Sequence, residues 1–294
     1  MAEREDSPFR RFAAEFAESR LALFGLALLV CIATVALLAP LVSPQNPYDL
    51  AQLDIMDSKL APGEQSPLGK TYWLGTDDQG RDMLSGIFFG LRISLLVGVS
   101  STVIALALGL LLGLIAAYAG GWVDTVIMRV VDIQLSFPAI LIALVLLAVL
   151  GQGVGKIIFA LITVQWAYYA RTVRSAALVE RQKEYIEAAR VLALPPGRIL
   201  LRHLLPNCIP PLIVVATVQV AHAITLEATL SFLGLGLPIT EPSLGLLIAN
   251  GFQYLMSGKY WISFYPGLAL VLTIVAINLV ADQLRDVLNP RLKR

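Results

Sequence analysis

The sequence predicts an all-α membrane protein with six transmembrane helices. Its 294 residues are 57% hydrophobic and only 15% charged, and their mean hydropathy is +0.75. Soluble domains carry roughly 25% charged residues and fewer than half apolar ones. Six segments are also apolar over about the 20 residues that a helix needs to cross the hydrocarbon core. We place these spans at residues 21–42, 94–118, 127–150, 156–173, 209–236 and 263–281.

The first span is predicted to be a retained signal anchor. Residues 1–20 form a tail that carries Arg4, Arg10, Arg11 and Arg20. A cleaved signal peptide has an apolar core of only about 7–15 residues and a small-residue cleavage site. The run at 21–42 is longer than that. We therefore expect it to remain as the first transmembrane helix.

The other five spans form a core at residues 94–281. A segment rich in Pro, Gly, Asp and Gln, residues 43–93, precedes this core and is predicted to be an external loop. The Gly-rich residues 151–155 are all that separates the third and fourth spans, which suits an antiparallel helical hairpin. In span two, the glycines of Gly109-Leu-Leu-Leu-Gly113 would permit close approach of a neighbouring helix.

Basic residues give the bundle an orientation. Sixteen of the 22 Lys and Arg fall on one side of a six-span bundle, in the N-terminal tail, at Arg129, in residues 171–202 and in the C-terminal tail at 282–294. Cytoplasmic loops carry this excess of positive charge. We expect both termini and residues 174–207 in the cytoplasm, and an interfacial aromatic belt at Tyr260, Trp261 and Tyr265 on the other side. The net charge of +1 gives no reason to expect a nucleic-acid partner.

The cytoplasmic segment 174–207 is amphipathic. Residues 176–194 have helical periodicity, and one face holds Leu178, Tyr185, Ile186, Ala189 and Leu192. Pro195-Pro196-Gly197 predicts a turn. A second short helix is expected from Arg198 to Leu205, closed by Pro206 and Asn207. A solvated linker has no need of an apolar stripe, so we predict a surface that docks on a cytoplasmic partner.

No segment has the spacing of a nucleotide-binding, metal or catalytic site. A phosphate-binding loop reads G-x-x-x-x-G-K-[ST], but residues 63–71 have five residues between their glycines and lie on the predicted external side. Asp77, Asp78 and Asp82 do not alternate as calcium ligands do, and they predict a turn and a helix cap instead. Cys31 and Cys208 lie in or beside apolar runs and are interpreted as packing residues. We expect a non-enzymatic chain that binds no cofactor or metal itself.

Polar residues inside the fifth span are candidates for a translocation path. Gln219 and His222 are three residues apart and share a helix face, and Glu227 lies five residues beyond. Ionisable groups inside a membrane are rare and often mark transport routes. The alternative for Glu227 is a hydrogen bond between helices that fixes their packing, and we prefer this alternative because proton-coupled carriers use several such groups.

Residues 187–206 resemble the EAA loop of ABC-importer permeases, which docks into a cleft of the ATPase subunit and transmits its closure. The residues that carry this resemblance, with those between them in the loop, are Glu187, Ala188, Ala189, Arg190, Ala193, Gly197, Leu205 and Pro206. The family's pattern continues after Glu-Ala-Ala with three residues and then a glycine, and this chain has Ala193 at that glycine position. Pro195-Pro196-Gly197 are the candidates to supply the break two residues later.

Other segments resemble the C-type subunits of dipeptide, oligopeptide and nickel permeases. The similarity runs from about residue 20 to the C-terminus and is strongest at residues 74–82, 90–95, 128–132, 137–138, 231–236 and 284–290. This resemblance implies a type I importer permease in the bacterial inner membrane. It also implies a B-type permease partner, two cytoplasmic ATPase subunits that bind ATP and Mg²⁺, and an extracytoplasmic substrate-binding protein.

Three readings of the function differ in their ligand or in their source of energy. The main reading is import of di- or oligopeptides, and nickel-chelate and glutathione importers share the same motifs. A stand-alone secondary carrier would transport without partners, driven by an ion gradient. A membrane scaffold or enzyme subunit would not transport at all. The EAA-like loop argues against the last two.

Overall fold

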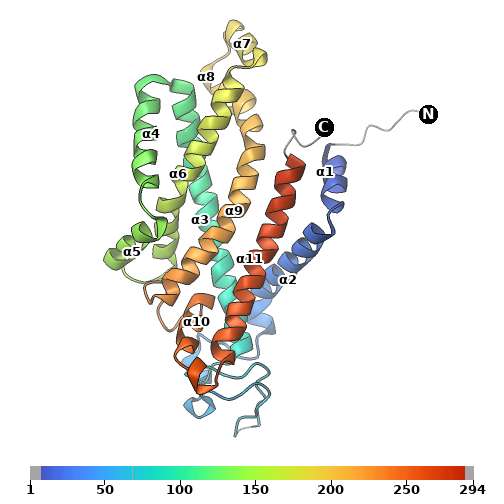
Figure 1. The fold of residues 1–294 in the computed structure, drawn as a ribbon, viewed down its shortest axis with the longest axis vertical. Coiled ribbons are helices and arrows are strands. Elements are labelled where there is room, and N and C mark those ends of the chain that lie inside the picture. Colours follow the sequence, from blue (N-terminus) through green and yellow to red (C-terminus); the bar gives the residue numbers. More distant parts are fainter. Residues whose placement is uncertain (1–7, 68, 289–294) are drawn as a thin grey trace, which may run out of the picture.

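The computed structural model describes residues 8–67 and 69–288, and every regular element in that part is helical (Figure 1). This confirms the all-α prediction. Arg4, Asn289, Pro290, Arg291, Lys293 and Arg294, which entered the charge count or the C-terminal motif, lie outside the described residues. The α-helices are α1 (Pro8–Ala17), α2 (Arg20–Val42), α3 (Met83–Ala119), α4 (Gly121–Leu135), α5 (Ala139–Leu150), α6 (Val154–Arg181), α7 (Glu184–Val191), α8 (Pro196–Arg198), α9 (Leu205–Phe232), α10 (Leu244–Phe252) and α11 (Trp261–Leu288). Short 3₁₀ turns lie at Leu50–Gln52, Ile55–Asp57 and Leu255–Ser257, and a π-helical turn, η3, lies at Ile199–Leu204.

Four helices in the described part are long and apolar enough to cross a membrane. They are α2, α3, α11 and the continuous helix Pro196–Phe232, and the bent pair of α4 and α5 would make a fifth span. Helix α6 has 28 residues but is not among these four. It carries Lys156 near its start and Arg171 and Arg174 further along, which lowers its mean hydropathy. The prediction of six spans therefore depends on α6.

The third predicted span, 127–150, is wrong as a single straight helix. The chain forms α4 and α5 instead, and their axes differ by 87°. Pro138 explains the break, because the residue before a proline is disfavoured in the helical region and Pro138 itself precedes the first turn of α5. The glycine-rich link at 151–155 does turn the chain, with φ of +80° at Gly151 and +135° at Gly153.

Helix α3 begins eleven residues before the predicted span. Asp82 caps it, because its carboxylate accepts hydrogen bonds from the Ser85 backbone N–H at 2.9 Å and from the Ser85 hydroxyl at 2.6 Å. The prediction of a turn and a helix cap at residues 75–82 is thus confirmed, and the segment between α2 and α3 is 43–82 rather than 43–93. Trp261 corrects the aromatic belt, since it is buried and its indole N–H donates to the Thr76 carbonyl at 3.2 Å.

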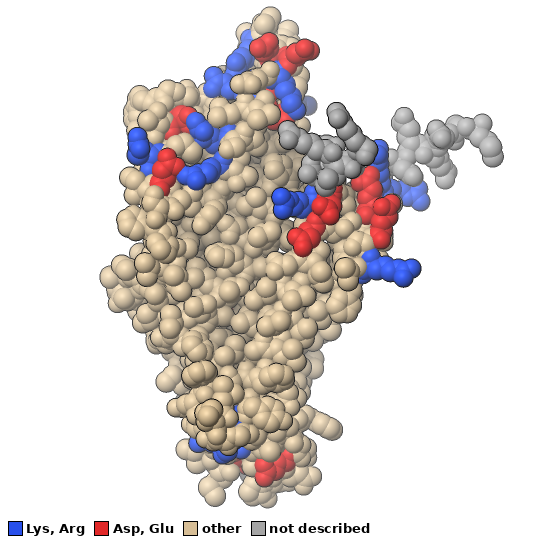
Figure 2. Space-filling view, in the orientation of Figure 1, with Lys and Arg blue, Asp and Glu red and all other residues tan. Residues whose placement is uncertain are grey.

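The two ends of the molecule differ in what they carry. Helices α7 and α8 lie toward the same end as α1 and the C-terminal end of α11, whereas segment 43–82 and α10 lie at the opposite end (Figure 1). We call these the α7 end and the α10 end. The face drawn in Figure 2 has its charged residues near these ends, with a broad uncharged region between them. This distribution is the one that a membrane-spanning bundle requires.

Helices α3 and α6 pack in close contact. A Cβ added to Gly109 would lie 2.5 Å from the Tyr169 Cβ, and one added to Gly113 would lie 2.6 Å from the Ala170 carbonyl oxygen. Only glycine permits this approach, so the prediction for Gly109 and Gly113 is confirmed. The two helices therefore form a fixed frame for the loop that follows α6.

Candidate functional site

The candidate site is the loop between α6 and α9 at the α7 end. The predicted helix at 176–194 is wrong, because α6 ends at Arg181 and α7 starts anew at Glu184. Side-chain hydrogen bonds hold the corner between α6 and α7, at residues 182–183. The Glu180 carboxylate accepts from the Lys183 ammonium and from the Tyr185 hydroxyl, both at 2.6 Å. Burial, followed by the bond to Glu180, raises the pKa of Tyr185 to about 12, which keeps its hydroxyl a donor.

The apolar stripe of α7 faces inward. Ile186 and Ala189 are buried in a cluster with Ile199 and Leu204, and Tyr118 from the end of α3 packs against it. The predicted apolar face therefore does not dock on a partner as a whole. Its Ile186 and Ala189 fold the loop on itself, which fixes the position of α7 relative to α3 and η3.

Ala193 ends α7 in the left-handed conformation, with a φ of +50°. Its N–H donates to the Arg190 carbonyl at 2.9 Å, and the Leu194 N–H donates to the Ala189 carbonyl at 3.2 Å. These two bonds are the Schellman pattern, which glycine usually ends. The break is thus at the family's glycine position itself. Pro195-Pro196-Gly197 do not supply it, because Pro196 and Gly197 already belong to α8.

The second predicted helix does not stop at Pro206. The chain is helical without interruption from Pro196 to Phe232, and Pro206 lies in the first turn of α9. The π-helical turn η3 explains this, because its wider bonding joins the Leu205 N–H to the Leu200 carbonyl just before the proline. Asn207 then ties the helix to the corner by donating to the Tyr185 hydroxyl at 3.0 Å.

The outward surface of this loop mixes charge with exposed apolar side chains. The predicted residues Glu187, Ala188, Arg190, Ala193, Gly197 and Pro206 are exposed, Leu205 is half-buried and Ala189 is buried. Val191, Leu192 and Leu201 are 86%, 73% and 65% exposed. Sequence periodicity missed Val191 and Leu201, because neither lies on the apolar stripe. We call the exposed residues of 184–202 the tip surface.

The polar residues of the fifth predicted span fall in two separate places. Gln219 and His222 line a groove of about 1000 Å³ between α6, α9 and α11. Glu227 is fully buried elsewhere and accepts from the Ser94 hydroxyl at 3.0 Å and the Ser231 hydroxyl at 2.8 Å. Glu227 thus joins α9 to α3 by a hydrogen bond, which is the contact that the packing alternative requires. The described residues contain no group of three or more potential metal-binding side chains, and both cysteines are free.

The fold and the site together define a class, that of multi-pass membrane proteins that display a helical loop at one end of the bundle. Residues 109–294 match the family described as "binding-protein-dependent transport system inner membrane component". Residues 7–62 match the "N-terminal TM domain of oligopeptide transport permease C". The chain therefore belongs to the family of inner membrane components of binding-protein-dependent transport systems, and it is a multi-pass inner membrane protein.

Curated relatives match nearly the whole chain. A putative peptide permease protein of Brucella suis is 40% identical over 97% of this chain and 91% of its own length. The Di/tripeptide transport system permease protein DppC of Pseudomonas aeruginosa is 38% identical over 98% of this chain and 93% of its own. Among solved structures, a chain of the inward-facing MetNI methionine ABC transporter superposes with a TM-score of 0.54 at 22% identity, covering 70% of this chain and 96% of that one. This last likeness supports the fold.

Proposed function

We propose that this chain is a permease subunit of an ATP-driven importer, and that it moves di- or oligopeptides across the inner membrane after a binding protein delivers them. The observation that carries the proposal is the tip surface. Val191 and Leu192 are exposed there, close in sequence to the exposed charged residues Glu187 and Arg190, and the packing of Ile186 and Ala189 holds α7 in place. A short helix of this kind, with apolar anchors and a charged rim, suits a groove in a cytoplasmic partner. The relatives named as peptide permeases supply the ligand class.

In this proposal α6 also crosses the membrane, as the fourth of six spans in chain order, and both termini and the tip surface are cytoplasmic. Gln165 is fully buried in α6 and contacts Thr102 of α3 and the Gln219 carbonyl of α9, so its polar side chain is satisfied inside the bundle rather than exposed to lipid. Reporter fusions after residues 60 and 185 test the topology. An external signal at 185 would overturn it.

The chain itself is expected to be non-catalytic, with ATP and Mg²⁺ bound by its partners. These partners are a B-type permease subunit, two cytoplasmic ATPase subunits and an extracytoplasmic binding protein. Closure of the ATPases would move the tip surface. Because Ile186 and Ala189 are packed against Tyr118, and Asn207 bonds to Tyr185, that movement would be passed to α3 and α9 rather than absorbed within the loop.

The test is co-purification of the chain with its associated subunits, followed by ATP hydrolysis in the presence of loaded binding protein. We expect di- or oligopeptides to stimulate hydrolysis. Stimulation by a nickel chelate or glutathione alone would reassign the ligand within the family. Uptake by the purified chain alone, driven by an ion gradient, would show a secondary carrier and overturn the proposal.

A further inference from the structure

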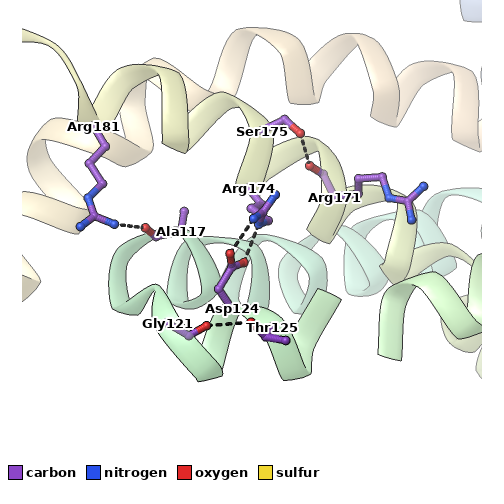
Figure 3. A network of polar contacts seen from close by, with 8 residues as sticks. All are labelled: Ala117, Gly121, Asp124, Thr125, Arg171, Arg174, Ser175 and Arg181. Atoms are coloured by element: carbon purple, nitrogen blue, oxygen red, sulfur yellow. Dashed lines mark hydrogen bonds and ion pairs between the residues drawn. The ribbon is translucent and has the colours of Figure 1, made fainter. Parts of the chain in front are cut away.

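Two ion pairs join α4 to α6 in the half of the molecule nearest the α7 end. The guanidinium of Arg174 in α6 donates two hydrogen bonds to the carboxylate of Asp124 in α4. The Nε–Oδ1 and Nη2–Oδ2 distances are both 2.5 Å (Figure 3). The two side chains are 30% and 19% exposed, so the pair is largely shielded from solvent. Farther from the α7 end, Arg171 of α6 forms an ion pair with Asp132 of α4. A two-armed bond of this kind fixes both distance and orientation.

These pairs belong to a unit that reaches the candidate site. Arg181, the last residue of α6, donates to the Ala117 carbonyl in the last turn of α3 at 2.8 Å (Figure 3). Val131 of α4 is buried against Ala167 and Ala170 of α6. The loop that carries the tip surface packs on the neighbouring Tyr118. The end of α3, α4 and α6 are thus joined at the base of α7.

Helix α4 leads away from this base to a different part of the bundle. After the 87° bend it becomes α5, whose buried Ala143 and Leu147 belong to one apolar cluster with Ala223 and Leu226 of α9. The tip surface is therefore connected to α9 in more than one way, including direct packing of Tyr169 and Val173 of α6 against Leu212 of α9. A second connection follows the chain through η3, and a third, the elbow route, passes from α6 to α4 and, after the 87° bend, to α5.

Apolar contacts alone would not fix the elbow route. Val131, Ala167 and Ala170 are small or branched apolar side chains, and such contacts tolerate a small sliding of one helix along another. The two-armed Asp124–Arg174 pair has one favourable geometry, so α4 must follow α6 when α6 moves. Breaking it leaves a partly desolvated charge without its partner.

We propose that Asp124 and Arg174 are positioning residues that couple α4 to α6. Through this pair, movement of the tip surface would pass from α6 to the bent pair of helices α4 and α5. This inference rests on the proposed function, because it needs an ATPase that moves the loop. Asp132 and Arg171 support the same linkage from a more exposed position, where a pair contributes less.

The test is Asp124→Asn in the assembled complex, with loaded binding protein and ATP. We expect unchanged assembly and basal hydrolysis, and a ligand-stimulated rate about tenfold lower, the factor that 1.4 kcal/mol represents. Arg174→Lys keeps the charge but loses the two-armed bond, so a smaller loss is expected. The exchange Asp124→Arg with Arg174→Asp should recover most of the stimulation. The control Arg11→Gln breaks the exposed 3.0 Å pair with Glu15 on α1 and should change nothing.

Full stimulation in Asp124→Asn would overturn the linkage while the proposed function stood. An assembled charge-exchange variant as impaired as Asp124→Asn would also overturn it, because the pair and not either side chain is what the inference requires. A wild-type complex that no ligand stimulates would instead refute the proposed function, and the linkage with it.

Discussion

Ala193→Gly tests whether the turn after α7 holds backbone strain. Ala193 has a φ of +50°, and its N–H and that of Leu194 close the Schellman bonds to α7. The left-handed conformation costs an L-residue about 1–2 kcal/mol, and glycine is free of this cost. Glycine also makes the unfolded chain more flexible, which offsets about 0.4–1 kcal/mol of the gain. The midpoints of these two ranges leave a net stabilisation of the turn of about 0.8 kcal/mol.

Amide hydrogen exchange of the peptide that covers residues 184–197 measures this difference in the assembled complex. We expect exchange of the capping amides to slow by about twofold to fivefold in Ala193→Gly. Ala188→Gly is the matched control, since Ala188 is an exposed residue inside α7. Glycine there costs about 0.5–1 kcal/mol and should speed exchange. Faster exchange in both variants would refute the assigned turn.

Three further predictions concern the rest of the bundle. Burial raises the pKa of Asp77 to about 6 from 3.8, so the folded state binds the proton more tightly than the unfolded state. Stability should therefore rise as pH falls from 6 toward 4, and Asp77→Asn should flatten that change in thermal unfolding. Glu227→Gln should keep transport and ligand preference, whereas Glu227→Ala should lower thermal stability by about 1–3 kcal/mol for each serine hydroxyl left unpaired. Gly109→Ala should cost about 1–3 kcal/mol, because its Cβ would fall 2.5 Å from that of Tyr169, and an unchanged melting temperature would contradict the close packing of α3 and α6.

Hydropathy and turn chemistry predicted much of the fold. Runs of apolar residues placed α2, α3, α9 and α11, because a membrane imposes the same length on every span. Asp82 and the glycines of 151–155 behaved as cap and turn because those roles depend on local geometry alone. The bend at Pro138 could have been predicted on the same grounds, since Phe137-Pro138 interrupts the third apolar run.

Tertiary contacts decided what the sequence could not. No glycine or proline marks the corner at Gln182 and Lys183, which the contacts of Glu180 hold. From the sequence alone, Pro206 predicts a helix end. In the structure the π-helical turn just before Pro206 lets the helix continue although the proline has no N–H to donate. The inward face of α7 had the same periodicity that a docking face would have, so only its contacts with Tyr118 and Ile199 assign it to the interior.

The candidate site was located by resemblance and refined by geometry. Glu187 and Ala193 lie where the motif places them, on an exposed surface and at the turn. The partner of Asp124 was beyond sequence reasoning, because 50 residues separate it from Arg174 and many basic residues in 171–202 were equally available.

Glu187→Lys, measured in the assembled complex, tests most directly whether the chain receives its energy through the tip surface. The side chain is exposed and lies on α7, so insertion and folding should be unchanged. We predict that ATP hydrolysis loses its stimulation by loaded binding protein, while the same change at exposed Glu184 has a smaller effect. Normal stimulation in assembled Glu187→Lys would contradict the account.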